Sequence, residues 1–167
     1  AGHLRQGLQL PPIPLPSTSG GTVTLAAEPG RILLLVYPWS GRPGRPNPPG
    51  WDDIPGAHGS TPELEGFRDR HAAFVQRGLE IFGLSAQTTA YQRELVERLQ
   101  LPFPILSDAR GRFAAALGLP TFSAGGTVYL RRLTLLLENG TIRDVFYPIA
   151  DPAAHAAALL RALDARP

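Results

Sequence analysis

One segment of this 167-residue chain combines a hydroxyl, a carboxylate and a helix start, which makes it the first place to look for chemistry. Residues 59–63 read Gly-Ser-Thr-Pro-Glu and follow a long loop that begins at Pro38. A helix is predicted to begin near Pro62. Its N-terminus would present unpaired backbone N–H groups and about half a positive charge, which stabilise an anion formed there. Ser60 occupies that spot.

Ser60 also has an ordinary structural explanation. Ser-x-x-Glu is a capping box, in which the Ser60 hydroxyl accepts a hydrogen bond from the backbone N–H of Glu63 and the carboxylate of Glu63 bonds back, worth about 1 kcal/mol. Alternatively, Thr61 caps the helix and Pro62 takes the first helical position. Judged from residue types alone, capping is a more frequent role than chemistry for a Ser at such a place.

A serine-hydrolase interpretation would need a His and an acid oriented on Ser60. His58 lies two residues away, but no Gly-x-Ser-x-Gly turn is present because Pro62 follows Thr61. The other histidines are scattered along the chain and show no metal-ligand spacing, so we expect neither a metal nor a cofactor. The adjacent carboxylates Asp52 and Asp53 are expected to face water.

The composition excludes several classes of function. Cysteine is absent, which removes disulfides, thiolate metal sites and thiol nucleophiles. The formal net charge is +2, and acidic residues such as Glu65 and Glu94 intersperse with the arginines, so no basic stripe for nucleic acid results. The apolar run from Ile32 to Tyr37 is too short to span a membrane. No leader pattern opens the chain, and a cytoplasmic location is the default expectation.

The strand that must position this segment is the run from Ile32 to Tyr37, which is apolar throughout and is therefore typical of a strand covered on both faces. Asn139-Gly140 between two β-type runs indicates a tight hairpin. Residues 8–16 are proline-rich and indicate an edge or an extended lead-in. We further predict strands over 22–25, 79–84, 103–106, 128–137 and 142–147, and helices over 62–77, 88–99, 112–117 and from 152 onward.

This order predicts one α/β domain over residues 1–167, with a mixed central sheet, helices on both faces, and a C-terminal β-hairpin followed by a helix. In such a sheet the active site is expected beyond the carboxyl end of a central strand, where the chain feeds a helix N-terminus. Here that place is the segment after Tyr37 together with residues 59–63. The loop from Pro38 to Gly59 is longer than a compact domain normally carries without a use, such as covering the site or contacting a second subunit.

Several blocks of the sequence, in the same order, resemble a peroxiredoxin of the alkyl hydroperoxide reductase and thiol-specific antioxidant family, and more narrowly a bacterial redoxin subgroup with an inserted Trp-Asp loop. The blocks cover nearly the whole chain and are residues 37–44, 50–63, 67–69, 82–87, 90–94, 101–108, 119–122, 132–134 and 145–148. The resemblance implies a thioredoxin-like fold and an antioxidant oxidoreductase of redox homeostasis. Its substrates would be hydrogen peroxide and organic hydroperoxides. Its partner would be an external thiol reductant such as a thioredoxin-like protein, and family members often form homodimers.

The resemblance also assigns roles residue by residue. Pro38 matches the proline that shields the site, Ser40 most nearly matches the family's hydroxyl residue, and Arg132 matches the arginine that holds the thiolate and the peroxide. Glu63, beside Thr61 at the helix start, matches the family's acidic residue. Because strand alternation places Arg131 and Arg132 on opposite faces, only one of them can point into the site.

Two positions depart from the family pattern. Ser60 stands where the family has its peroxidatic cysteine, and Glu65 stands where some members have a second cysteine. The second change fits a member that relies on an outside thiol. The first removes the reaction, because a Ser hydroxyl stays protonated and has no stable counterpart of a sulfenic acid.

Two explanations fit Ser60: a substitution introduced to hold the site in its reduced form, or natural loss of the thiol. The sequence therefore predicts a peroxidase framework that is inactive as written. The alternative is a noncatalytic redoxin-like scaffold that binds a protein partner or a small ligand.

Overall fold

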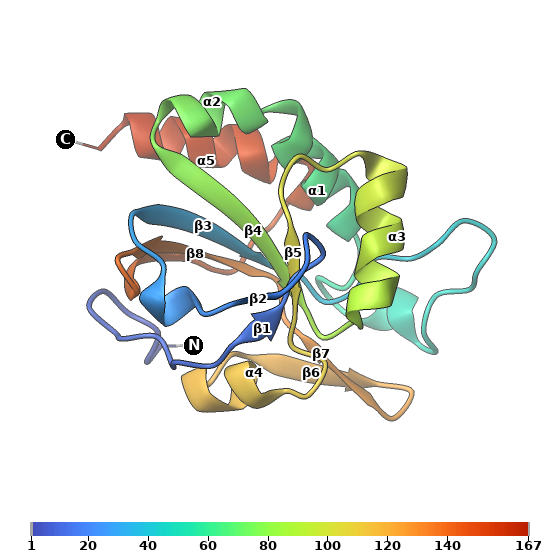
Figure 1. The fold of residues 1–167 in the computed structure, drawn as a ribbon. Coiled ribbons are helices and arrows are strands. Elements are labelled where there is room, and N and C mark those ends of the chain that lie inside the picture. The colour runs from blue at the N-terminus through green and yellow to red at the C-terminus, as the bar shows by residue number, and fades with distance from the viewer. Residues whose placement is uncertain (1, 167) are drawn as a thin grey trace.

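A five-stranded mixed sheet in the order β5-β4-β3-β8-β9 forms the centre of the computed structural model, which describes residues 2–166 (Figure 1). Its middle strand is β3 (Arg31–Val36), the predicted apolar run. β3 pairs in parallel with β4 (Leu79–Ser85) and antiparallel with β8 (Leu133–Glu138). β5 (Ile105–Ser107) extends the sheet in parallel beyond β4, and β9 (Thr141–Phe146) closes the other edge. The central strand is thus covered on both sides by neighbouring strands.

Helices cover both faces of the sheet, as predicted. Alternate residues of β3 point to opposite faces, so Leu33 and Leu35 belong to one core cluster and Leu34 and Val36 to the other. The first cluster packs against α1 (Ser60–Asp69), α2 (His71–Gln76), α3 (Thr89–Leu99) and α5 (His155–Asp164). The second packs against α4 (Arg112–Leu117) and the N-terminal segment, on the side opposite α2 and α5 in Figure 1.

The C-terminal hairpin is also confirmed. Asn139 and Gly140 both have positive φ angles, 49° and 82°, as the tight turn between β8 and β9 requires. The side chain of Asn139 accepts a hydrogen bond from the backbone N–H of Gly30 at 2.8 Å, which ties the turn to the start of β3. After β9 the short helix η3 (Pro152–Ala154) leads into α5, in place of a single helix from Pro152.

The predicted helix over 62–77 is wrong in two respects. It begins at Ser60 rather than Pro62, and it is divided at Arg70 into α1 and α2. Arg70 adopts φ −109° and ψ 13°, outside the helical range, so α2 leaves the direction that the periodicity had implied. Val75, near the end of α2, is 52% exposed.

The predicted strand over 128–137 is likewise two strands. Residues Thr127–Leu130 form β7, which pairs antiparallel with an unpredicted strand β6 (Thr121–Ala124), while β8 starts at Leu133. Gly125 and Gly126, both with positive φ, make the turn of this separate hairpin. Arg131 and Arg132 lie between the two strands, which frees Arg132 to turn inward.

The remaining elements are short. β1 (Leu15–Pro16) pairs with β2 (Thr22–Val23), and the helical turns η1 (Leu25–Ala27) and η2 (Trp51–Asp53) follow in the next two loops. The proline-rich lead-in is therefore extended, as expected. Among residues 2–166, no helix has the length and apolarity needed to cross a membrane.

Candidate active site

The predicted site residues meet where the chain leaves β3 and where α1 begins. Tyr37, Pro38 and Ser40 are buried directly after β3. Gly59 has a φ of 106°, and a Cβ at this position would lie 2.9 Å from a carbon of the Pro152 side chain, so both conformation and space favour glycine. The turn at Gly59 places Ser60 as the first residue of α1.

The capping box does not form. Gly59 is the N-cap, and no side chain caps α1; the backbone N–H of Glu63 instead donates to the carbonyl oxygen of Gly59 at 3.0 Å. The Ser60 side chain is buried at 3% exposure, and its Oγ has no hydrogen-bond partner among the described residues. Glu63 is drawn to a different partner, a buried guanidinium, which forms a stronger charge-assisted bond than a backbone amide.

That guanidinium belongs to Arg132. Its Nη1 donates to Oε1 of Glu63 at 2.8 Å, and its Nη2 donates to the carbonyl oxygen of His58 at 3.1 Å. Weaker contacts of 3.4 Å reach the carbonyl oxygens of Gly56 and Ala57. Arg132 is 5% exposed and Glu63 is 1% exposed, so the pair is desolvated. Burial raises the pKa of the Glu63 carboxyl to about 7, against the opposing effect of the Arg132 charge.

Arg132 lies beside the first turn of α1. Its hydrogen bonds go to Glu63 and to the carbonyl oxygens of residues 56–58, not to Ser60. Within residues 2–166, the Oγ of Ser60 and the Nε of Arg132 are both buried and both lack a hydrogen-bond partner. Each retains one unused polar atom. Arg131 has a different position, with its guanidinium 5.4 Å from the ring centre of Phe122.

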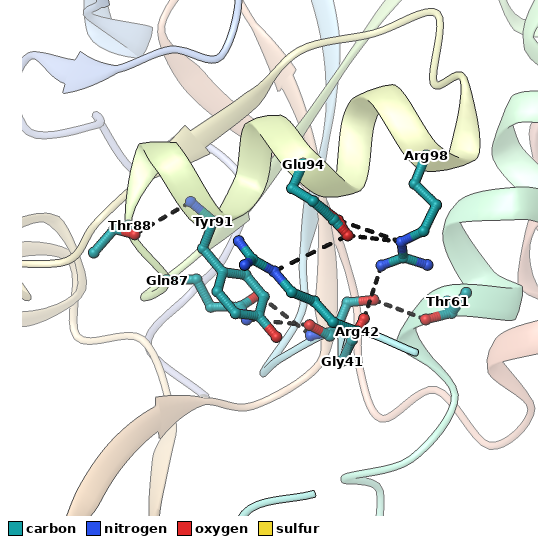
Figure 2. Close-up of polar contacts among 9 residues, drawn as sticks. Gly41, Arg42, Thr61, Gln87, Thr88, Tyr91, Glu94 and Arg98 are labelled. Atoms are coloured by element: carbon teal, nitrogen blue, oxygen red, sulfur yellow. Dashed lines mark hydrogen bonds and ion pairs between the residues drawn. The ribbon is translucent and has the colours of Figure 1, made fainter. Parts of the chain in front are cut away.

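Ser40 and Thr61 join the loop after β3 to the first turn of α1. Their hydroxyl oxygens lie 2.7 Å apart, close enough for one to donate to the other (Figure 2). Glu65 lies on the next turn of α1, where its carboxylate is 3.8 Å from Arg68. Glu65, which was predicted to match a second cysteine, is therefore half-buried, and its ion pair with Arg68 lies within α1.

The hydrolase arrangement is not formed. His58 is exposed and pairs with Asp52 at 2.7 Å, while the Ser60 hydroxyl accepts no bond from any histidine of the described chain. The part of the chain that the structure describes also holds no group of three or more His, Asp or Glu side chains suited to a metal ion.

A buried histidine behind the site was not singled out by its sequence context. Nε2 of His155, at the start of α5, lies 2.9 Å from Oγ1 of Thr134, and the ring packs edge-on against Phe67 with centroids 5.4 Å apart. Burial, together with the charge of Arg132, lowers the pKa of His155 to about 4. Its packing against an α1 residue is a contact that spacing along the chain could not indicate.

The loop from Pro38 to Gly59 is fastened to the β6–β7 hairpin by aromatic packing. Trp51 is 3% exposed and lies 5.5 Å from Trp39, 5.6 Å from Phe122 and 5.0 Å from Tyr129, measured between ring centroids. We call these four residues the aromatic cluster. Because Arg132 holds the last residues of the same loop, the loop is fixed at its middle and at its end.

The mixed sheet, with helices on both faces and a central strand that leads toward a buried residue at a helix N-terminus, has the architecture of the thioredoxin-like class, to which peroxiredoxins belong. The AhpC/TSA family profile matches residues 55–145, which begin at the end of the loop and run from α1 through β8 and most of β9; β3 lies before the matched range. The chain therefore belongs to the AhpC/TSA family.

Its relatives are peroxiredoxins of the Q and Bcp type. The chain is 26% identical to the chloroplastic peroxiredoxin Q of Oryza sativa subsp. japonica over 163 residues, which cover 97% of this chain and 68% of the rice protein. It is 26% identical over 141 residues to peroxiredoxin bcp1 of Schizosaccharomyces pombe, covering 83% of this chain and 63% of that protein.

Solved structures confirm the thioredoxin-like peroxiredoxin fold. The structure of peroxidoxin BcpB from Mycobacterium tuberculosis superposes with a TM-score of 0.75 at 25% identity, covering 99% of both chains. A Cys-to-Ser mutant of Xylella fastidiosa PrxQ gives a TM-score of 0.77 at 19% identity, covering 99% of this chain and 98% of that one.

Proposed function

We propose that residue 60 is the peroxidatic position of a thiol-dependent peroxidase, and that the chain carrying Ser60 does not itself turn over peroxide. The observation that carries this proposal is the placement of Ser60: first residue of α1, buried, with an unpartnered Oγ one turn before the Arg132–Glu63 pair. Membership of the peroxiredoxin family supports peroxide as the substrate class and an external thiol as the reductant.

The chemistry at this position requires sulfur. A thiolate attacks one peroxide oxygen, an S–O bond forms as the O–O bond breaks, and the departing alkoxide or hydroxide takes up a proton. The sulfur is oxidised to a sulfenic acid, and the peroxide is reduced to an alcohol or water. Two external thiols then reduce the sulfenic acid and leave as a disulfide and water. A helix N-terminus lowers the pKa of a thiol and so populates the thiolate, whereas a Ser hydroxyl there stays protonated.

The test is to restore the sulfur and measure peroxide consumption with dithiothreitol as the reductant. The Ser60→Cys variant is compared with the Ser60 chain and with Ser123→Cys, which places a thiol on an exposed position of β6. Because the chain has no other cysteine, each variant carries one thiol. We expect consumption by Ser60→Cys well above that of both controls. Equal rates for the two Cys variants, or turnover by the Ser60 chain itself, would overturn the proposal.

A further inference from the structure

The side chain of Gln87 binds both backbone polar groups of Ser40. The backbone N–H of Ser40 donates to Oε1 of Gln87 at 3.2 Å, and Nε2 of Gln87 donates to the carbonyl oxygen of Ser40 at 3.2 Å (Figure 2). One amide side chain therefore gives Ser40 the pair of hydrogen bonds that a neighbouring strand residue would supply.

These two bonds lie beyond the end of β3, where no neighbouring strand pairs with the chain. β3 ends at Val36, and the bond from the backbone N–H of Tyr37 to Leu84 is the last that continues the strand pairing. Pro38 has no N–H to donate. Ser40 is buried, so its backbone groups need partners from elsewhere in the protein.

Gln87 is itself held firmly. Its backbone N–H donates to Oγ of Ser85 at 3.3 Å, and its carbonyl oxygen accepts from Oγ of Ser107 at 2.7 Å. Both serines are buried at the carboxyl ends of the parallel strands β4 and β5. The backbone of Gln87 is thus bonded to residues at the ends of two paired strands, which fixes the place from which its side-chain amide extends.

One face of α3 contacts the residues of the loop that follow Ser40. Tyr91, Glu94 and Arg98 follow at spacings of three and four residues, so they share a side of the helix. The guanidinium of Arg42 lies 4.0 Å from the ring centre of Tyr91, and Nη2 of Arg98 donates to the carbonyl oxygen of Gly41 at 2.9 Å. Figure 2 shows these side chains between α3 and the loop.

We propose that Gln87 is a positioning residue for position 60. Its amide fixes the backbone of Ser40, which directs the Ser40 hydroxyl onto Thr61 at 2.7 Å and so holds the first turn of α1 in which residue 60 lies. This inference rests on the proposed function for its catalytic consequence. We call the two hydrogen bonds between the Gln87 side chain and the Ser40 backbone the clamp; they are present in the chain that carries Ser60.

The first experiment therefore uses the chain as it stands. Gln87→Leu removes both hydrogen bonds, and Thr88→Ala is the matched control: it removes the N-cap bond to Tyr91 at the start of α3 without touching Ser40. We expect backbone amide hydrogen exchange at Ser40 and at Glu63, whose N–H donates to Gly59 in the first turn of α1, to be about tenfold faster in Gln87→Leu than in Thr88→Ala. Equal protection of these two amides in both variants would overturn the clamp.

The second experiment measures the consequence at position 60 in the Ser60→Cys background. The thiol pKa is read from the pH dependence of alkylation by iodoacetamide, which does not require peroxidase activity. We expect Gln87→Leu to raise that pKa by about half a unit or more, because a loosened first turn aims its N–H groups less well at the sulfur. Thr88→Ala is expected to leave it unchanged.

A double-mutant cycle separates positioning through Ser40 from general destabilisation. If Gln87 acts through the Ser40 hydroxyl, Gln87→Leu adds less than about a twofold change in alkylation rate once Ser40→Ala is present. Equal effects with and without Ser40→Ala would refute the proposal. A Ser60→Cys protein that fails to reduce peroxide while still showing this coupling would refute the proposed function and leave the positioning role supported.

Discussion

Arg132 donates to Glu63 across 2.8 Å, although the two residues lie 69 positions apart in the chain and both side chains are almost fully buried. The pair joins the start of β8 to the first turn of α1. Arg132 also binds the carbonyl oxygens of residues 56–58, so a single side chain fixes both the end of the long loop and the helix that follows it.

Breaking this pair from one side should be costly. Arg132→Leu leaves Glu63 buried without its guanidinium partner and also removes the donor to the carbonyl oxygen of His58; at about pH 8, where Glu63 is ionised, it is expected to lower the free energy of unfolding by about 3–5 kcal/mol. Urea denaturation measures the loss. The matched control is Asp164→Asn, which breaks the exposed pair with Arg77 and should change little. Comparable losses at the buried and exposed pairs would contradict the prediction.

The dependence of stability on pH should reveal two opposing groups. The Glu63 carboxyl has its pKa raised to about 7 in the folded protein, so its contribution to stability is full below about pH 4.5 and is lost as pH rises to about 7. His155 has its pKa lowered to about 4, so its contribution is full above about pH 6.5 and is lost as pH falls to about 4. Between about pH 4.5 and 6.5 the contribution of Glu63 to the free energy of unfolding falls while that of His155 rises, so the two changes nearly cancel.

Substituting one of the two groups should reveal the pH dependence of stability that the other contributes. Relative to the unsubstituted chain, His155→Gln should lose stability as pH rises from 4.5 to 6.5, and Glu63→Gln should gain stability over the same range. Each difference should reach on the order of 2–3 kcal/mol. Unfolding free energies at half-unit pH steps provide the measurement. Difference curves of the same sign would show that the assignment is wrong.

The aromatic cluster should be the main anchor of the long loop. Trp51→Ala removes a buried ring that contacts Trp39, Phe122 and Tyr129, and is expected to cost about 3–5 kcal/mol. Val128→Ala, on an exposed position of the same hairpin, should cost less than about 0.5 kcal/mol. Thermal denaturation distinguishes the two. A loss for Trp51→Ala no larger than for Val128→Ala would mean that the loop is held elsewhere.

Gly140 and Gly126 offer a test of close backbone approach at matched conformation. Their φ angles are 82° and 80°, so alanine is strained at both by about 1 kcal/mol. A Cβ at Gly140 would also lie 2.2 Å from the carbonyl oxygen of Ala26, whereas nothing lies within 4 Å at Gly126. Gly140→Ala should therefore lower the midpoint of thermal unfolding clearly more than Gly126→Ala. Equal shifts would remove the steric part of the argument.

The sequence predicts the parts of this fold that depend on local patterns. The apolar run that becomes β3 and the Asn139-Gly140 hairpin are recognisable because burial on both faces and positive φ angles each demand particular residue types. The break at Arg70 is not, because the spacing of apolar residues continues across it. The β6–β7 hairpin was missed although Gly125-Gly126 is a turn signal in the sequence, and the charged residues Arg131 and Arg132 mark the break before β8.

The site was predictable as a place but not as a set of contacts. A resemblance to peroxiredoxins could bring together Pro38, Ser40, Ser60 and Arg132, yet local residue types favoured a capping box for Glu63. Its actual partner is distant in the chain, and only the fold brings the two together. The same holds for Gln87, which binds the Ser40 backbone rather than a complementary side chain. Almost every residue has a backbone N–H and C=O, so residue types do not indicate which one a side chain such as Gln87 will bind.

The packing of Trp39 against Trp51 has a spectroscopic consequence. These are the only two indole rings in the chain, and they meet at 65° with their centres 5.5 Å apart. Transition dipoles this close and inclined to each other couple, so the near-ultraviolet circular dichroism of the folded protein should carry an exciton signature. All of its indole signal would then originate in the segment that leads into α1, which gives an optical view of that segment alone.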